Sequence, residues 1–376
     1  MDWLINTAYY VVPFIVLLGV LVFVHELGHF MVARLCGVKV SHFSIGFGKK
    51  LWSRIDKHGT EWQLAAIPLG GYCRFLGDDD ATSSTDAAAT LNEEDKKFAF
   101  ATQNPFKKLA IVLAGPGANY LFAILVFASI FFFLGKLDFP AVVGEVIKGG
   151  AAEAGGVLSG DKILKVDGKT IASFTELSQE VSMHTQGDVR LEIERDGKII
   201  HLTFPLKIVP LEIEANQPKE QKPMLGVRSV SVVEVKPEQI SLPQALYDAT
   251  AETWRITEVT LRGIGQIITG KRGSEEVGGI LRIAEMSGDI TKENGVLDFI
   301  AFMALLSINL GLLNLFPIPL LDGGHVVIYT IEIITRHEID NRVKECIFRF
   351  GLFLLVSLML FATYNDFAHL FNRWFS

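Results

Sequence analysis

Five consecutive residues near the N-terminus, His25-Glu26-Leu27-Gly28-His29, form the pattern HExxH. On a helix, residues i and i+4 share one face, so the two imidazoles can bind one Zn²⁺ while Glu26 lies beside the water that the metal activates. The pattern alone also occurs in proteins that bind no metal. Here it ends an uncharged run, Leu4 to Val24. Ionisable side chains in a membrane segment are costly, which favours a functional site.

A catalytic zinc site takes a third protein ligand and leaves its fourth position to water. Asp322 is the leading candidate, because it closes the apolar run Phe299 to Leu321 where two prolines break the helix and two glycines free the backbone. An ordinary helix end with a capping carboxylate would give the same pattern. The first and third apolar runs are expected to cross in the same direction, which brings HExxH and Asp322 to one level and favours a ligand. His325 lies further past the break and is the weaker candidate.

Two further features are candidates for holding a substrate. Asn314, one or two helical turns before Asp322, could hold a substrate backbone or an oxyanion, although an amide that packs between helices explains it equally well. The segment Glu61 to Phe75 predicts a hairpin because Gly70 and Gly71 separate two β-prone runs. Its apolar character suggests that it associates with the membrane. Such a hairpin could receive an unwound substrate as an added strand.

The elements that must position these residues are membrane-spanning helices. The chain has 376 residues, 49% of them hydrophobic and 20% charged, a composition typical of a polytopic membrane protein with an aqueous part. A spanning helix needs about 20 apolar residues. Runs that meet or approach this length are Leu4 to Val24, Leu109 to Gly135, Phe299 to Leu321 and Phe350 to Asn365. The first is not expected to be a cleaved signal peptide, because Met1 to Trp3 contains no basic residue.

The basic residues predict how these spans are oriented. Loops rich in Lys and Arg stay on the cytoplasmic side. The short loop between the third and fourth spans contains Arg336, Arg342, Lys344 and Arg349. The active site is therefore expected near the cytoplasmic face, with both termini and the segment 136–298 on the other side. In a bacterium this corresponds to a multi-pass protein of the cytoplasmic (inner) membrane, with the lipid bilayer as a partner.

Charge and cysteine content exclude two other classes of partner or site. The net charge of -7 is spread over the polar regions, so no nucleic-acid partner is expected. Cys36, Cys73 and Cys346 have no CxxC spacing. They predict free thiols rather than a disulfide scaffold or a thiolate zinc site.

The long outer segment contains a small β-rich domain. Strand-like runs between residues 142 and 210 are joined by Asp-Gly pairs at 167–168 and 196–197, which are tight-turn signals. Residues 211–298 are expected to form a linker, or partly extended strand up to Pro237, followed by an amphipathic helix, because apolar residues recur at helical spacing between Leu246 and Ile268. That helix either lies on the outer membrane surface or packs on the soluble domain.

These expectations define the fold class as a polytopic α-helical membrane protein. It has four transmembrane helices, a membrane-associated β-hairpin and an inserted β-rich extracytoplasmic domain. The predicted segments are the first transmembrane helix with HExxH (1–33), a cytoplasmic loop with the hairpin (34–108), the second helix (109–135), the β-rich domain (142–210), the linker and amphipathic helix (211–298), the third transmembrane segment with Asp322 (299–325) and the fourth helix (343–371).

Taken together, these motifs resemble the site-2 protease family, the bacterial intramembrane zinc metalloproteases of peptidase family M50. The resemblance covers almost the whole chain. It rests on HExxH, on NxxPxPxLDGG from Asn314 to Gly324, on AGPGAN from Ala114 to Asn119, and on Gly144 to Thr170, which resembles a PDZ domain. It implies one zinc ion per chain, bound by His25, His29 and Asp322, with Glu26 as the general base.

The resemblance also implies regulated intramembrane proteolysis. The substrates would be single-span membrane proteins, such as anti-sigma factors already trimmed by a first protease, and remnant signal peptides. The best-known proteobacterial members carry two PDZ domains, whereas one copy of the pattern is found here. The alternative is a non-catalytic, membrane-anchored PDZ adaptor with a structural metal site. Glu26 argues against it, because a structural zinc site needs no general base.

Overall fold

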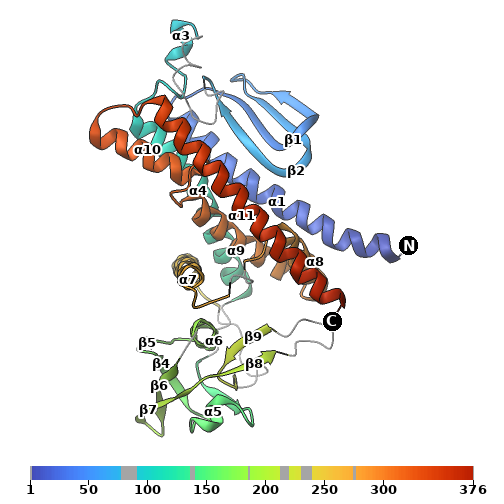
Figure 1. The fold of residues 1–376 in the computed structure, drawn as a ribbon, viewed down its shortest axis with the longest axis vertical. Helices are drawn as coiled ribbons and strands as arrows, with labels where there is room; N and C mark the ends of the chain where they lie inside the picture. The colour runs from blue at the N-terminus through green and yellow to red at the C-terminus, as the bar shows by residue number, and fades with distance from the viewer. Residues whose placement is uncertain are drawn as a thin grey trace. The chain divides into compact units, whose positions relative to one another are not determined.

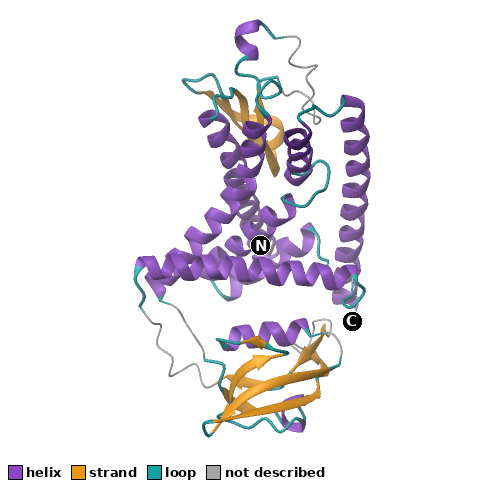
Figure 2. Ribbon diagram, turned by 90° about the vertical axis from the view of Figure 1, so that its left-hand side faces the viewer, coloured by secondary structure: helices purple, strands orange, loops and turns teal. Residues whose placement is uncertain are grey.

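Figure 1 shows the computed structural model of the chain, which describes residues 2–77, 91–135, 140–184, 187–211, 220–229, 239–273 and 277–375. The chain divides into two compact units, which are described separately. The first contains residues 1–128, 246–258 and 277–366, and the second contains residues 129–245, 259–276 and 367–376. Strands occur in both units (Figure 2), but the long apolar helices lie mainly in the first.

Four helices in the described part of the chain are long and apolar enough to cross a membrane. They lie within α1 (Asp2–Leu35), α4 (Pro105–Leu134), α9 (Val296–Asn314) and α11 (Asn341–Phe375). Each of them contains most or all of one of the predicted apolar runs. The chain therefore has the build of a multi-pass membrane protein.

The third span ends earlier than the sequence predicts. Helix α9 stops at Asn314, and a separate helix, α10 (Asp322–Thr335), starts at Asp322. Pro317 and Pro319 lie between the two helices, and a proline can neither donate a backbone hydrogen bond nor continue a helix. The two prolines thus lie at the helix break that the sequence predicted, but the predicted span to Leu321 is too long, because Asp322 opens a new helix instead of closing the span.

A small sheet in the first unit is built from β1 (Val40–Ile55) and β2 (Glu61–Phe75). Phe43 of β1 lies opposite both Trp62 and Cys73 of β2, so the two limbs of β2 flank the first half of β1. The predicted hairpin within Glu61–Phe75 is therefore wrong, because in the described register both limbs pair with β1.

The turn of the true hairpin lies between the strands, at residues 56–60. Gly70, at a φ of +140°, forms the bend between the two limbs of β2. A Cβ atom at Gly70 would lie 2.5 Å from the ring of Phe47, so this bend excludes a side chain. The sequence located the bend but could not give its partner strand, which precedes it in the chain.

The apolar core of the first unit joins the sheet to the helices. One buried cluster connects α1, the sheet, α4, α10 and α11, and includes Phe30, Phe43, Phe75, Phe100, Ile111, Tyr329 and Phe348. A second cluster joins α1 to α9 through Leu17, Leu21, Phe299, Phe302 and Met303. A short helix, α3 (Glu93–Lys96), precedes α4. The sheet is thus held against the helix that carries HExxH.

Helix α8 (Ile280–Glu293), which the sequence did not predict, packs against α1. The hydroxyl of Tyr10 donates a hydrogen bond of 2.9 Å to Asp289. The carboxylate of Asp366 on α11 accepts hydrogen bonds from the backbone N–H groups of Gly279 and Leu281, at 2.7 and 3.0 Å. This carboxylate satisfies N–H groups at the start of α8 that have no partner within the helix.

The second unit is a β-rich domain with its own core. Its four-stranded antiparallel sheet has the order β5 (Lys169–Thr170), β4 (Lys162–Val166), β6 (Asp188–Arg195) and β7 (Lys198–Pro205). The helices α5 (Ala151–Ala154) and α6 (Phe174–Met183) accompany it. Its buried residues include Val143, Ile163, Leu177, Leu191, Ile193 and Phe204. Both predicted Asp-Gly turns are confirmed, with Asp167 and Asp196 at φ values of 49° and 50°.

The β-rich domain extends beyond its predicted end at residue 210. Strand β10 (Val227–Ser229) pairs with β3 (Val143–Val146) at the start of the domain, and β8 (Lys207–Leu211) pairs with β9 (Glu220–Met224). At the beginning of the predicted linker the structure thus has strands, which agrees with the alternative of partly extended strand up to Pro237. Residues 212–219 and 230–238 of that predicted linker lie outside the described residues.

The predicted amphipathic helix is α7 (Leu242–Ile268). Its residues 259–268 belong to the second unit and pack on α6. There Arg262 lies 2.6 Å from Glu180, and the side-chain amide of Gln266 donates to the carbonyl of Met183 at 2.6 Å. For this part of α7, the contacts support packing on the soluble domain. For the remaining residues of α7, the position on the outer membrane surface and packing on the soluble domain both stay predictions.

A buried ion pair in the second unit gives the first prediction. Asp161 is 1% exposed and accepts hydrogen bonds from Arg195 at 2.6 and 2.7 Å. Burial opposes ionisation of Asp161, but the bonds from Arg195 and from the N–H of Leu158 lower its pKa. We expect Asp161→Asn to destabilise this domain by roughly 3 kcal/mol, since it removes the buried carboxylate that pairs with Arg195 and leaves that guanidinium only its bond to the carbonyl of Gly156. The measurement is hydrogen exchange of the amides of β4 and β6 in the intact protein.

The matched control is Glu145→Gln, which removes an exposed pair with Arg228 and should cost under about 1 kcal/mol. The pKa of Asp161 is lowered on folding. Its contribution to the folding stability of the domain is therefore complete at pH values above the ordinary pKa of an aspartate, and is lost as the pH falls below that value. Equal protection of β4 and β6 in the Asp161 and Glu145 variants would contradict the prediction.

Candidate metal centre

The side chains of His25, His29 and Asp322 converge at one point of the first unit. The Nε2 atoms of His25 and His29 are 3.2 Å apart. Carboxylate oxygens of Asp322 lie 3.2 Å from Nε2 of His25 and 3.5 Å from Nε2 of His29. These three donors are the group that could hold a metal ion among the described residues.

The donor geometry fits zinc. Zinc in a tetrahedral site binds nitrogen and oxygen at about 2.0–2.2 Å, which places neighbouring ligand atoms about 3.3 Å apart. The observed separations of 3.2 to 3.5 Å agree with this edge length. Oδ2 of Asp322 is buried and has no hydrogen-bond partner in the described part of the chain. A buried carboxylate oxygen without a donor is costly unless a cation balances it.

The second nitrogen of each imidazole is also engaged. Nδ1 of His29 lies 2.8 Å from the carbonyl oxygen of Ile111. Since a carbonyl only accepts, Nδ1 carries the proton and Nε2 keeps its lone pair for a metal. Nδ1 of His25 lies 3.1 Å from the side-chain amide of Asn119, whose Oδ1 has no partner among the described residues. Turning that amide by 180° lets Oδ1 accept the His25 proton, which gives His25 the same tautomer.

Two glycines allow the helices to approach closely enough for this arrangement. A Cβ atom at Gly28 of α1 would lie 2.2 Å from the carbonyl oxygen of Ala114 on α4. A Cβ atom at Gly115 would lie 2.3 Å from Nε2 of His29 and 2.8 Å from Cε1 of His25. The backbone of α4 therefore packs directly against both imidazoles. Any side chain at Gly115 would occupy the space that the ligand rings need.

The donors open into a cavity of about 410 Å³. Its lining includes the predicted residues Glu26, Asn314 and Gly71, but not Gly70. The other lining residues are Tyr72, Cys73, Phe75, Phe100, Val112, Leu320, Leu321, His325 and Tyr329. His325 lines this cavity without joining the three donors. The structure thus brings together every predicted site residue except Gly70, which forms the neighbouring bend.

Glu26 lies between the donors and the second limb of β2. The backbone N–H of Cys73 donates to its carboxylate, and a Cβ atom at Gly71 would lie 3.5 Å from its Cγ. Glu26 interacts electrostatically with His25, His29 and Asp322 but is not one of the three clustered donors. It is therefore free to exchange a proton with a molecule in the cavity.

Sequence reasoning did not assign Ile111, Gly115 and Asn119 to the site. Gly115 and Asn119 belong to the AGPGAN segment, which was noted only for its resemblance to a family motif. A glycine and an asparagine four residues apart inside an uncharged span were an available signal, because a small residue marks close helix packing and a polar side chain in a membrane helix faces other protein rather than lipid. The carbonyl of Ile111 had no such signal, since every residue has one.

Comparison with known proteins agrees with this geometry. The sequence pattern of Peptidase family M50 matches residues 13–358. The chain belongs to this family. It is similar to metalloprotease MmpA of Caulobacter vibrioides, with 37% identity over 380 residues that cover 94% of each protein. Proteins named as zinc metalloproteases from Rhizobium meliloti and Rickettsia conorii are each 37% identical, over 99% and 96% of this chain and 100% and 99% of their own lengths.

The family and the relatives settle the enzyme class. This M50 protein is a zinc metalloprotease of the site-2 type, built as a multi-pass membrane protein. Zinc is its metal. The predicted family, enzyme class and cofactor are confirmed.

The close packing at Gly115 gives the second prediction. We expect Gly115→Ala to lower zinc retention by about 10-fold or more, as changes next to metal ligands do, because the new methyl group displaces His25 and His29. The control is Gly117→Ala on the same helix, where a Cβ atom meets nothing within 4 Å. Zinc content of the purified proteins after dialysis against a weak chelator provides the measurement. Equal zinc loss in both variants would show that Gly115 has no special role.

Proposed function

We propose that this protein is an intramembrane zinc endopeptidase in which His25, His29 and Asp322 bind the zinc ion and Glu26 is the general base. The observation that carries the proposal is the convergence of three donors from α1 and α10 with the spacing of a zinc tetrahedron. Zinc supplies a Lewis acid that polarises the scissile carbonyl and acidifies the attacking water. An ion held by these three donors would border the cavity that Glu26 and Cys73 line.

Glu26 performs the proton transfers in this proposal. Its carboxylate accepts the proton of the attacking water and then delivers it to the leaving amine. The hydrogen bond from the N–H of Cys73 orients the carboxylate in the cavity. Asn314, at the end of α9, lines the same cavity and would hold the substrate backbone or the oxyanion.

The second limb of β2 would hold the substrate. Residues Gly71 to Phe75 pair with β1 through one edge, and Gly71, Tyr72 and Cys73 line the catalytic cavity. An extended peptide can add to a strand edge through main-chain hydrogen bonds. Such pairing would keep the substrate unwound, which cleavage of a transmembrane helix requires. This proposed role in holding the substrate does not depend on the hairpin pairing that the structure corrects.

The substrates in this proposal are single-span membrane proteins, including trimmed anti-sigma factors and remnant signal peptides. The β-rich second unit would be a PDZ-like domain, since it combines an antiparallel sheet with the helices α5 and α6 around one core. We place the protein in the bacterial inner membrane, with the active site near the cytoplasmic face and with this domain and both termini outside. The support for this orientation is the cluster of basic residues between α9 and α11.

The alternative of a non-catalytic adaptor has weaker support. A structural zinc site usually closes with four protein ligands, whereas three donors cluster among the described residues. Glu26 lines the same cavity without being one of the three clustered donors, and a structural ion would give this carboxylate no role.

The third prediction separates metal binding from proton transfer. Glu26→Gln should keep its zinc and lose cleavage of a model transmembrane substrate by about 100-fold or more, because an amide cannot accept the proton. Asp322→Asn should lose both zinc and cleavage, because it removes an anionic ligand. Metal analysis and gel-based cleavage of the purified variants in detergent provide the measurements. Retained proteolysis in Glu26→Gln would refute the base, and a zinc-loaded, active Asp322→Asn would remove Asp322 from the site.

The fourth prediction tests the substrate strand through a natural thiol. Cys73 is half-buried beside Glu26, whereas Cys36 and Cys346 lie outside the cavity. In a Glu26→Gln protein that also carries Cys36→Ser and Cys346→Ser, a substrate cysteine next to the scissile bond should form a disulfide with Cys73 on mild oxidation. The same substrate cysteine moved ten residues away is the control. Cross-linking that does not depend on the cysteine's position would contradict strand addition at this edge.

A further inference from the structure

The turn between β1 and β2 carries a second cavity, separate from the catalytic one. Its volume is about 270 Å³, and its lining residues are Trp52, Arg54, Ile55, Asp56, Lys57 and Trp62. It shares no lining residue with the cavity around His25. The mechanism above does not use it.

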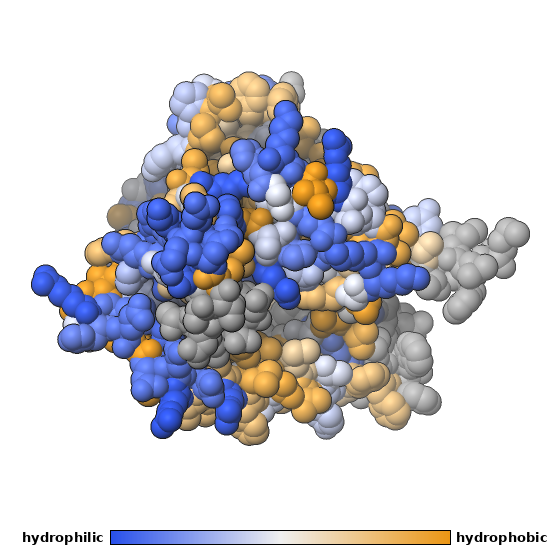
Figure 3. Space-filling model, turned by 90° about the horizontal axis from the view of Figure 1, so that it is seen from above, coloured by the Kyte–Doolittle hydropathy of each residue, from blue (hydrophilic) through white to orange (hydrophobic). Residues whose placement is uncertain are grey.

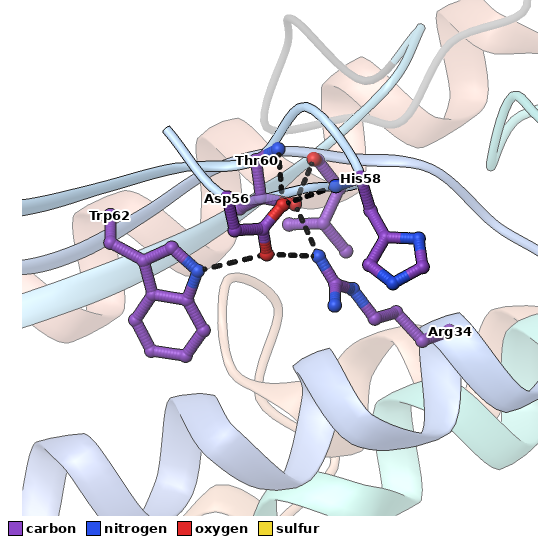
Figure 4. Close-up of polar contacts among 6 residues, drawn as sticks. Arg34, Asp56, His58, Thr60 and Trp62 are labelled. Carbon is purple, nitrogen blue, oxygen red and sulfur yellow. Dashed lines mark hydrogen bonds and ion pairs between the residues drawn. The ribbon is translucent and has the colours of Figure 1, made fainter. Parts of the chain in front are cut away.

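The back of this cavity is built around the carboxylate of Asp56 (Figure 4). Asp56 accepts hydrogen bonds from the N–H groups of His58 and Thr60 at 2.8 and 3.1 Å, from Nε1 of Trp62 at 3.1 Å, and from the guanidinium of Arg34. Burial opposes its ionisation, but these donors together lower its pKa to about 2. Asp56 is therefore charged at neutral pH, and Arg34 offsets its charge.

The wall beside Asp56 is also fixed by aromatic packing. The ring of Trp62 lies 4.9 Å from that of Phe30 and 4.4 Å from that of Phe43, and the guanidinium of Arg34 lies 4.3 Å from the ring of Phe30. Thr60 donates from its hydroxyl to the carbonyl of Val40 at 2.7 Å. These contacts tie the turn to α1 and preorganise one side of the cavity.

The mouth of the cavity is cationic and apolar. Arg54 and Lys57 are exposed, and neither forms an ion pair or side-chain hydrogen bond with another described residue. Trp52 is 54% exposed and Ile55 is 68% exposed. Since Arg34 offsets Asp56, two positive charges remain beside two exposed apolar side chains. Figure 3 looks onto this end of the first unit and shows hydrophilic and hydrophobic residues interleaved on its surface.

The position of the turn matches the end of a membrane span. Arg34 lies in the last turn of α1, and the apolar span within that helix ends at Leu35. The ion pair between Arg34 and Asp56 holds the cavity at this level. The interface of a bilayer is where tryptophan rings and basic side chains meet lipid phosphates.

We propose that the cavity at the β1–β2 turn binds the phosphate headgroup of an anionic phospholipid. Arg54 and Lys57 contact the phosphate, while Trp52 and Ile55 contact the upper part of the acyl chains. A soluble anion would use the two cations but leave both apolar side chains in water. An acidic peptide would likewise gain little from their place at the end of a span. The bound lipid would fix the turn, and with it the sheet whose other limb borders Glu26.

The experiment uses the full-length protein in nanodiscs, with Trp3, Trp254 and Trp374 changed to Phe, so that Trp52 and Trp62, which both line the cavity, are the remaining fluorophores. The probes are brominated phosphatidylglycerol and brominated phosphatidylcholine, each as a minority component, which quench a tryptophan that they contact. We expect stronger quenching by the anionic lipid. Arg54→Gln with Lys57→Gln should lower the preference by about 25-fold, since each basic side chain near an anionic surface contributes roughly fivefold.

Lys148→Gln with Lys198→Gln is the matched control, because both lysines are exposed on the second unit and the change in charge is the same. It should leave the preference unchanged. Retention of zinc by each variant, and by the protein with Trp52 and Trp62 as its only tryptophans, shows that it is folded. Equal quenching by the two lipids, or an undiminished preference in the Arg54 and Lys57 variant, would overturn the proposal. Inorganic phosphate or a soluble acidic peptide that abolishes the preference would assign the cavity to that ligand and overturn it as well.

Discussion

The contact between α1 and α4 is the constraint on which the metal centre depends. Gly28 on one helix and Gly115 on the other lack the Cβ atoms that would separate the two backbones. The close approach brings the carbonyl of Ile111 within 2.8 Å of His29 and the amide of Asn119 within 3.1 Å of His25. A hydrogen bond at Nδ1 fixes the tautomer in which Nε2 keeps its lone pair for a metal. One helix therefore provides two donors, and its neighbour decides which nitrogen of each donor is available.

The remaining parts of the site meet the α1–α4 pair from two sides. Asp322 arrives from the start of α10, where Gly323 and Gly324 let the preceding loop fold onto the helix; a Cβ atom at Gly323 would lie 2.1 Å from the carbonyl of Phe316. The second limb of β2, which precedes α4 in the sequence, packs with Gly71 against Val22 and Glu26 of α1. Glycines at both approaches show the same principle, since backbone must replace side chain where several elements meet within one cavity.

The sequence predicted local features well and long-range pairing poorly. The spacing of His25 and His29 follows from helix periodicity. The prediction that Asp322 lies at the same membrane depth as HExxH followed from the direction of two spans, so neither prediction required a strand register. The partner of Glu61–Phe75 could not be predicted in this way, because Phe43 is inserted between its two limbs and register is a non-local property. The end of the β-rich domain was missed for a related reason, since β10 completes it by pairing with β3 across most of the domain. Ile111 acts through its backbone carbonyl and so carries no signal in the sequence, whereas Asn119 lies in AGPGAN but acts only by positioning His25.

The separation of the ligands along the chain has a mechanical consequence. With the proposed ligand set, a single ion links two helices whose donors are 293 positions apart, from His29 to Asp322. Closing so large a loop removes chain entropy from the unfolded ensemble, and binding energy that needs the folded geometry adds to folding stability. Zinc would then fasten the first membrane helix to the segment after the third, in the manner of a removable cross-link. Removal of zinc by a chelator would therefore lower the folding stability of the protein as well as abolish its catalytic activity.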